Sequence, residues 1–328
     1  MARPGPSARV ITTATAPATA TATDTNLAPH ELRILVAVAD AGGFTAAAEA
    51  LGITQSAVSH SVRGSEGKIG AVLFERGRAG ARPTPAGERA VAHARRVLRL
   101  LGLLTAEARA AARPEPADAV AGPLRIAAFR SVALHLLPPV LQRLRERHPA
   151  LEPRVRIVRE VGRGTAGEVA DGRADLALAT LDGTTPLPSG LVAHRLFEEP
   201  YAFVHPSGHP APRSLPLADW VENCGSYTRA WWSAQAWIPS ATVEAEDDGA
   251  VLSLVSTGHA MAIMPALSLT AAPRSVGIAD LGPDRPSRTI GYATTPELAS
   301  TALVRALVRE LRAATPAMPE ALRAARHA

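Results

Sequence analysis

A short run of polar side chains near the N-terminal end carries the residue types that read nucleic acid. The run extends from Gln55 through Ser56, Ala57, Val58 and Ser59 to His60, and Arg63 follows it. Glutamine can pair bidentately with adenine, serine and histidine can serve bases or phosphates, and arginine can read guanine or anchor a phosphate. Double-stranded DNA is therefore the predicted partner.

The surrounding residues predict the helices that would present this run. Apolar residues recur at helical spacing over 32–39, and Gly42 and Gly43 give a stop signal. Thr45 is expected to cap a second helix over 46–51, which Gly52 would end in left-handed backbone. Thr54 is expected to cap a third helix. This pattern predicts a helix-turn-helix, whose second helix enters the major groove of DNA.

In the third helix, an inward face and an outward face can be assigned by periodicity. We expect the small and branched residues to face inward, namely Ala57, Val58 and Val62. The residues then left to the solvent side are Gln55, Ser56, Ser59, His60 and Arg63. These five are the predicted reading residues, and Thr45 and Thr54 at the helix starts are added to them.

A glycine-rich segment with three arginines follows the third helix. Short extended stretches flank it, so it is predicted to form a wing that lies along a phosphate backbone or minor groove. The expected contacts of the wing are Arg76, Arg78 and Arg82.

From residue 27 to about residue 104, the chain resembles the LysR-type transcriptional regulators. Four motifs in family order carry the resemblance: Phe44-Thr45-Ala46-Ala47-Ala48-Glu49-Ala50-Leu51, Thr54-Gln55-Ser56-Ala57-Val58-Ser59, Leu73-Phe74-Glu75-Arg76 and Thr84-Pro85-Ala86-Gly87. The resemblance implies a winged helix-turn-helix over 26–84, a linker helix that pairs two chains, and an effector-binding domain. The family regulates transcription from promoter DNA, so RNA polymerase is a further candidate partner.

The chain departs from the family pattern after Arg63. Gly64, Ser65 and Gly67 stand where the family has a charged helix with a buried leucine. A glycine inside a helix costs roughly 1 kcal/mol relative to alanine, so the third helix is expected to fray early. Pro83 also replaces the usual aliphatic residue before Thr84.

A long helix is predicted over residues 85–113, with an apolar seam at near-heptad spacing. Such a seam normally packs against a partner helix, which predicts a homodimer, from which a homotetramer can form. The expected pairing residues are Val91, Leu98, Leu101 and Leu104. The alternative is that the helix packs on its own domain. Two prolines, Pro114 and Pro116, then begin a hinge over 114–122.

Strand and helix patterns alternate in the rest of the chain. The strand-helix order over residues 124–180 predicts a parallel sheet with right-handed crossovers. Strands are expected at 124–129, 154–161, 175–180, 202–205 and 290–294, and helices at 134–147, 168–173, 249–256 and 299–313. The fold class is therefore α + α/β: a winged helix-turn-helix, a linker helix, and a two-lobed α/β domain that looks like periplasmic solute-binding proteins.

The chain is expected to leave the first lobe, build the second and return. The first lobe would hold 123–197 and 269–315, and the second 198–268. Residues 1–25 are expected to form a disordered extension, unless they reflect a start codon assigned too early, and 316–328 a tail.

A ligand cleft is expected where strand ends meet helix starts between the two lobes. The predicted effector-binding residues are Arg130, Ser131, Thr180, Gly225, Ser226, Tyr227 and Asp248. Arg130 beside a helix start favours an anionic effector. Four tryptophans between 220 and 237 suggest an aromatic one, although such residues also pack in cores.

The sequence contains no recognisable catalytic or metal-binding set. It has no G-x-S-x-G, no H-E-x-x-H and a single cysteine, so no catalytic residue, metal or cofactor is predicted. Residues 162–167 fit G-x-G-x-x-G, but they follow the second strand and open a short helix, which disfavours nucleotide binding. The chain is not expected to be an enzyme. A DNA-binding head fused to a metabolite-processing enzyme and an effector-free architectural DNA binder are the alternatives.

Charge is distributed unevenly along the chain. Residues 26–113 hold 12 basic and 7 acidic residues, so the whole net charge of +5 lies there. This distribution is typical of a DNA-binding end joined to a neutral ligand-binding end. The lone Cys224 excludes an internal disulfide, and no apolar run reaches membrane-spanning length. We therefore expect a cytoplasmic bacterial regulator.

Overall fold

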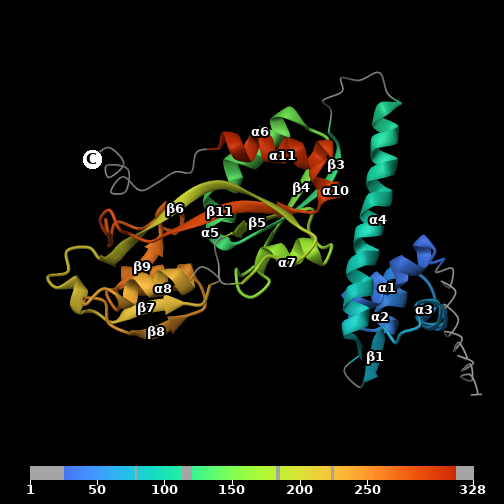
Figure 1. The fold of residues 1–328 in the computed structure, drawn as a ribbon, viewed down its shortest axis with the longest axis horizontal. Coiled ribbons are helices and arrows are strands. Elements are labelled where there is room, and N and C mark those ends of the chain that lie inside the picture. The colour runs from blue at the N-terminus through green and yellow to red at the C-terminus, as the bar shows by residue number, and fades with distance from the viewer. Residues whose placement is uncertain (1–25, 78–79, 113–119, 182–184, 223–224, 315–328) are drawn as a thin grey trace, which may run out of the picture. The chain divides into compact units, whose positions relative to one another are not determined.

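The computed structural model describes residues 26–77, 80–112, 120–181, 185–222 and 225–314, and these form two units divided after Gly87. The expected extension over 1–25 and tail over 316–328 lie outside the described residues, as does most of the expected hinge. Figure 1 shows the elements of both units.

Three helices build the first unit: α1 (Pro29–Ala41), α2 (Phe44–Leu51) and α3 (Gln55–Ile69). Gly42 and Gly52 end α1 and α2 with φ angles of 67° and 65°, as the stop signals predicted. The Thr54 hydroxyl accepts a hydrogen bond from the Ala57 N–H at 3.2 Å, which confirms the predicted cap of α3. The cap predicted at Thr45 is wrong, because α2 begins two residues earlier than expected, at Phe44, and its N-cap is Gly43.

Helix α3 runs without a break through Gly64 and Gly67, so the expected early fraying is wrong. Tertiary contacts hold its last turns. Glu66 accepts a hydrogen bond from the Leu73 N–H at 2.8 Å, and Lys68 forms an ion pair with Glu31 of α1 at 2.8 Å. In this ion pair Lys68 donates a hydrogen bond to the Glu31 carboxylate, which holds the pKa of Glu31 below its usual value. Fixing a helix end in this way offsets the low helix propensity of glycine.

An antiparallel ribbon, β1 (Phe74–Gly77) with β2 (Gly80–Pro83), forms the predicted wing. The Ala81 N–H donates to the Gly42 carbonyl at 2.8 Å, which fastens β2 to the end of α1. Pro83 stands opposite Phe74 at the base of the ribbon, where the strand ends. Its place at the strand end explains why proline is tolerated there.

The long helix α4 (Pro85–Ala111) starts at the end of the first unit, and from Glu88 on it belongs to the second. Arg99 of α4 donates to Asp175 at 2.9 and 2.8 Å, and the Asp175 side chain is fully buried. Leu103 joins a large apolar cluster built from the sheet and helices of the α/β region. Part of α4 therefore packs on its own unit, which was the alternative to pairing with a second chain.

A seven-stranded mixed sheet forms the framework of the α/β region. Its order is β10-β6-β11-β5-β3-β4, with β9 beside β6. The strands are β3 (Gly122–Ala128), β4 (Leu151–Ile157), β5 (Leu176–Thr180), β6 (Val192–Pro206), β9 (Ala262–Pro265), β10 (Val276–Ala279) and β11 (Ser287–Thr294). Only β3, β4 and β5 are parallel, because β11 runs antiparallel to both β5 and β6. The parallel arrangement expected from the first three strands is therefore confirmed, and the later strands of the sheet run antiparallel to their neighbours.

Strand β6 connects the two lobes. Its first half, Val192–Pro200, pairs with β11, and its second half, Tyr201–Pro206, pairs with β9 and β10. We call the part around β3, β4, β5 and β11 the first lobe, and the part around β9, β10 and the second half of β6 the second lobe. Because β10 belongs to the second lobe, the strand pairing of that lobe continues past the return expected at residue 269.

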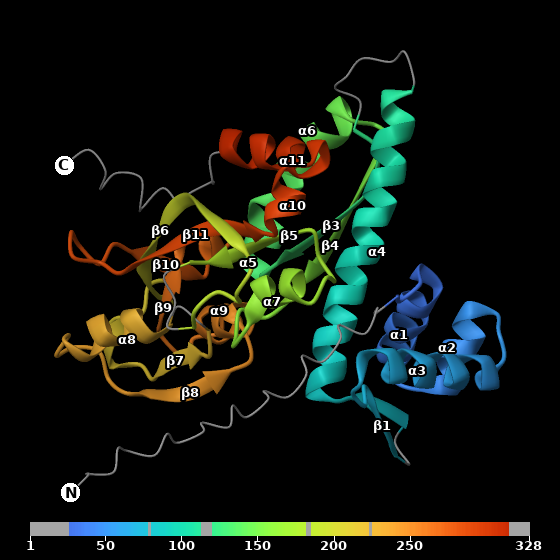
Figure 2. The same cartoon turned by 45° about the vertical axis from the view of Figure 1, so that its right-hand side comes forward.

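Helices cover both faces of the first lobe. Figures 1 and 2 show α6 (Leu137–Arg147) and α11 (Ala302–Ala313) together on one face and α7 (Gly164–Ala170) on the other. The expected helix over 134–147 is two helices, α5 (Arg130–His135) and α6, because Pro138 and Pro139 disfavour helical backbone just before them. The short α10 (Pro296–Ala299) precedes α11.

The second lobe adds a parallel pair, β7 (Leu217–Trp220) with β8 (Ala241–Ala245), and two helices. These are α8 (Gly225–Ser233) and α9 (Asp248–Ser256), and both views place α8, β7 and β8 close together. Short 3-10 turns lie at Pro212–Ser214 and Ala266–Leu269. A separate apolar cluster that includes Val251, Val255 and Met264 forms the core of this lobe.

Candidate functional site

Helix α3 presents a polar face on the first unit. Val58 and Val62 are buried, with 0% and 1% of their surface exposed, and they fix α3 against the core. The exposed polar residues of the predicted set are Gln55, Ser56, His60 and Arg63. Two predictions are corrected here. Ser59 is only 7% exposed and therefore faces the core, whereas Ala57 is exposed.

Arginines of the ribbon lie on the same unit. The Arg76 guanidinium stacks over the Phe44 ring at 4.4 Å, which positions it beside the start of α2. Arg82 on β2 is exposed, and so is Thr45 on α2. Arg78 lies outside the described residues. The described part of this unit thus carries arginines on the ribbon, and on α3 three neutral polar side chains together with Arg63.

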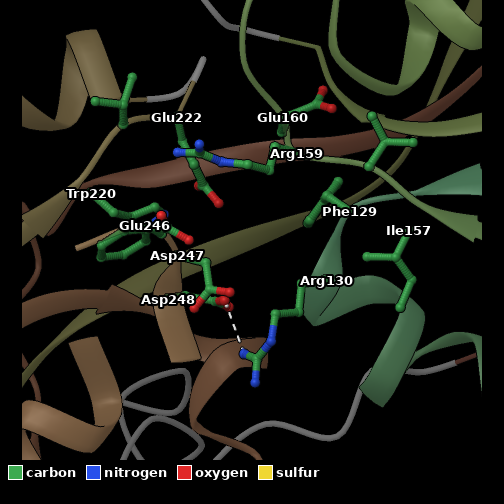
Figure 3. A pocket seen from close by; sticks show the side chains of 12 residues that line it. Phe129, Arg130, Ile157, Arg159, Glu160, Trp220, Glu222, Glu246, Asp247 and Asp248 are labelled. Atoms are coloured by element: carbon green, nitrogen blue, oxygen red, sulfur yellow. Dashed lines mark hydrogen bonds and ion pairs between the residues drawn. The ribbon is translucent and has the colours of Figure 1, made fainter. Parts of the chain in front are cut away.

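A cleft lies between the two lobes of the second unit. Figure 3 shows the side chains that line it. They are Phe129, Arg130, Ile157, Val158, Arg159, Glu160, Trp220, Val221, Glu222, Glu246, Asp247 and Asp248. Sequence reasoning placed Arg130 and Asp248 here. It missed Arg159 and Glu160 shortly after β4, and Glu222 shortly after β7, although charged residues just beyond a strand end are a usable signal.

Arg130 and Asp248 join the two lobes across this cleft. Arg130 Nη1 donates to Asp248 Oδ1 at 3.0 Å, and Figure 3 marks the contact. The other carboxylate oxygen of Asp248, Oδ2, accepts a hydrogen bond from the Ser268 hydroxyl at 2.6 Å. Gly249, the next residue of α9, has no side chain, and a Cβ there would overlap the Arg130 guanidinium. The glycine therefore admits the arginine to the start of α9.

Glu160 is a buried acid on the first-lobe wall. It is 3% exposed and accepts hydrogen bonds from the Thr165 N–H at 2.9 Å and the Thr180 N–H at 3.1 Å. Burial raises the pKa of Glu160 above its usual value, against the opposite effect of these hydrogen bonds.

A buried ionic network adjoins the cleft through Glu222. Arg288 of β11 donates to Glu199 at 2.7 Å, to Glu222 at 3.0 Å and to the Ser131 hydroxyl at 3.2 Å. The Arg288 side chain is 1% exposed and that of Glu199 is fully buried. Burial raises the pKa of Glu199, while Arg288 opposes this shift. Glu222 lines the cleft, so this network connects the cleft to β6 and β11.

The remaining predicted effector residues are differently placed. Ser131 is 2% exposed and binds Arg288 instead of lining the cleft. Thr180 is 6% exposed, and its hydroxyl has no hydrogen-bond partner in the described part of the chain. Gly225, Ser226 and Tyr227 begin α8, but their side chains lie outside what the structure describes.

Of the four clustered tryptophans, Trp220 alone is among the residues that line the cleft. Trp232 is buried in a second-lobe apolar cluster with Tyr201 and Phe203, and Trp231 and Trp237 pack against that cluster. Core packing, the alternative raised from the sequence, therefore describes these three residues.

The described residues contain no group of three or more His, Cys, Asp or Glu side chains placed to hold a metal ion. Among the same residues, no helix is both long enough and apolar enough to cross a membrane.

Comparisons with known proteins agree over both units. Residues 29–88 match the bacterial regulatory helix-turn-helix protein of the lysR family, and residues 117–316 match the LysR substrate binding domain. The probable HTH-type transcriptional regulator LrrA of Synechococcus elongatus is 31% identical over 87% of this chain and 97% of its own length.

Two solved structures share the fold. A full-length OxyR variant from Pseudomonas aeruginosa has a TM-score of 0.67 at 20% identity, covering 90% of this chain and 99% of its own. Full-length CbnR complexed with its target DNA has a TM-score of 0.61 at 20% identity, covering 88% and 99%. The chain belongs to the LysR family of DNA-binding transcriptional regulators, which carry an effector-binding domain.

Proposed function

We propose that this regulator reads its promoter DNA with the exposed face of α3 and holds the flanking phosphates with the ribbon. The observation that carries the proposal is the exposure of Gln55, Ser56, His60 and Arg63 on a helix whose start is fixed by the Thr54 cap. Polar side chains on a rigid helix are what direct readout in the major groove needs. Arg76 and Arg82, with Arg78 between them in the sequence, supply the positive charge for phosphate contacts.

The cleft between the lobes is the proposed effector site. It offers charged groups from both lobes, and the Arg130–Asp248 contact ties one wall to the other. An effector that binds one arrangement of the lobes better than another shifts the balance between them by that difference in affinity. The chain then works as a ligand-controlled regulator and not as an enzyme.

The apolar residues that α4 leaves exposed support a homo-oligomer. Val97, Leu100, Leu101 and Leu104 are 43%, 40%, 39% and 66% exposed in the single chain. Val91, by contrast, is 2% exposed within the chain, so the pairing surface is proposed to rest on Leu98, Leu101 and Leu104. A dimer would present two copies of α3 to half-sites about one turn of DNA apart. The proposal includes RNA polymerase as a partner and the cytoplasm as the location.

The first test is a mobility shift with the DNA immediately upstream of the chain's own gene, across a salt series. A complex that survives competitor DNA is expected for the wild type. Gln55→Ala is expected to relax the preference at one base position, with a loss of about 1–3 kcal/mol of discrimination. Gln142→Ala, an exposed glutamine on α6, is the matched control. Specificity that survives Gln55→Ala unchanged removes this residue from direct readout.

A further inference from the structure

The two walls of the cleft carry opposite charges. The second-lobe wall contributes four carboxylates, from Glu222, Glu246, Asp247 and Asp248, and Figure 3 shows them on one side. The first-lobe wall contributes both arginines of the lining, Arg130 and Arg159, together with the buried Glu160. Four carboxyl groups thus face two guanidinium groups, and the lining has an excess of acid.

Part of this charge is already engaged. Arg130 pairs with Asp248, and Glu222 pairs with Arg288 from behind the cleft. Arg159 and Glu246 have neither an ion pair nor a hydrogen bond within the described residues, and Asp247 accepts only the Ala250 N–H at 2.9 Å, as the cap of α9. One cation on the first-lobe wall and two anions on the second-lobe wall therefore remain for a ligand.

We propose that the effector is a small zwitterion with net positive charge, of amino-acid size. Its carboxylate would accept from Arg159, and its ammonium or guanidinium groups would pair with Glu246 and Asp247. This inference rests on the proposed function of the cleft as the effector site. It replaces the anionic effector expected from Arg130, because Asp248 already neutralises that arginine.

The test measures binding of four probes to the full-length chain by calorimetry and by thermal shift. The probes are L-arginine, L-leucine, L-glutamate and benzoate. L-Arginine is expected to bind most tightly and to raise the melting temperature. Glu246→Gln and Arg159→Gln are each expected to weaken L-arginine about tenfold, as loss of one charge-assisted contact does. Glu244→Gln, an exposed carboxylate on β8 that does not line the cleft, is the matched control and is expected to change nothing.

Three results would overturn the proposal. They are tighter binding of L-glutamate or benzoate than of L-arginine, unchanged L-arginine affinity in Glu246→Gln, and no L-arginine binding at millimolar concentrations. The mobility shift on the same preparation separates this failure from failure of the proposed function. A specific DNA complex without L-arginine binding refutes the effector class alone, whereas loss of both refutes the regulator function.

Discussion

Arg130 and Asp248 form an ion pair between the two lobes, with Nη1 and Oδ1 3.0 Å apart. The aspartate side chain is 5% exposed and the arginine side chain 41%. The aspartate on the second lobe is therefore shielded from water, whereas the arginine on the first lobe remains partly accessible to it. Any molecule that enters the cleft meets this pair, so its strength contributes to the balance between lobe arrangements.

A double-mutant cycle of Arg130→Gln and Asp248→Asn is expected to give a coupling energy of about 1 kcal/mol in the free energy of unfolding, because one partner is buried. Gly249→Ala provides an independent route to the same contact, since its Cβ displaces the Arg130 guanidinium. Its effect should not add to that of Arg130→Gln. Urea unfolding measures all of these changes, and strict additivity would show that the ion pair contributes nothing.

Arg82→Ala is expected to weaken binding to every DNA sequence and to lower the slope of log K against log salt by about one unit, because one phosphate contact is lost. Arg78→Ala should behave in the same way. Arg145→Ala, an exposed arginine of α6, is the matched control. The measurement is a mobility-shift titration at several salt concentrations. If the slope does not change, these arginines do not touch phosphate.

Replacing both Leu101 and Leu104 by aspartate is expected to leave monomers in solution. These side chains are 39% and 66% exposed, so the change removes an apolar surface without opening the core of the chain. Val72→Asp, at a 64% exposed valine outside α4, should leave the oligomer intact. Analytical ultracentrifugation gives the mass directly, and a surviving dimer in the double variant would place the interface elsewhere.

Gly64→Ala is expected to stabilise the chain by about 1 kcal/mol, because α3 is helical there and nothing lies within 4 Å of the added Cβ. Gly87→Ala should do the opposite, since its Cβ would overlap the Leu73 carbonyl. Thermal and urea unfolding of both variants tests this contrast. A destabilised Gly64→Ala would mean that α3 is strained at this position.

The raised pKa of Glu160 gives stability a specific pH dependence. Its folded pKa lies above the ordinary value of 4.5, so the folded state holds a proton that the unfolded state has lost. Its contribution is thus most favourable below pH 4.5 and declines as pH rises through the folded pKa. Unfolding free energies measured across this range should fall less steeply in Glu160→Gln than in the wild type. Equal slopes would contradict the burial effect.

Local patterns were enough to predict the DNA-binding unit. Thr54, Gly42 and Gly52 act on neighbours a few residues away, so the cap and the helix ends follow from sequence spacing. The same reasoning failed at Gly64 and Gly67, where contacts of Glu66 and Lys68 with distant residues hold the helix. It also failed at Ser59, because a small polar side chain fits either face of a helix.

The sequence by itself determined the family, the winged helix-turn-helix and the alternation of strands and helices, because periodicity and capping are local. The tertiary structure alone decided that β6 crosses between the lobes, that Arg288 is buried between Glu199 and Glu222, and that Arg130 meets Asp248. Each of these contacts joins residues far apart in the chain. Their side chains carry no periodic signal, and only the folded arrangement brings the opposite charges of the cleft together.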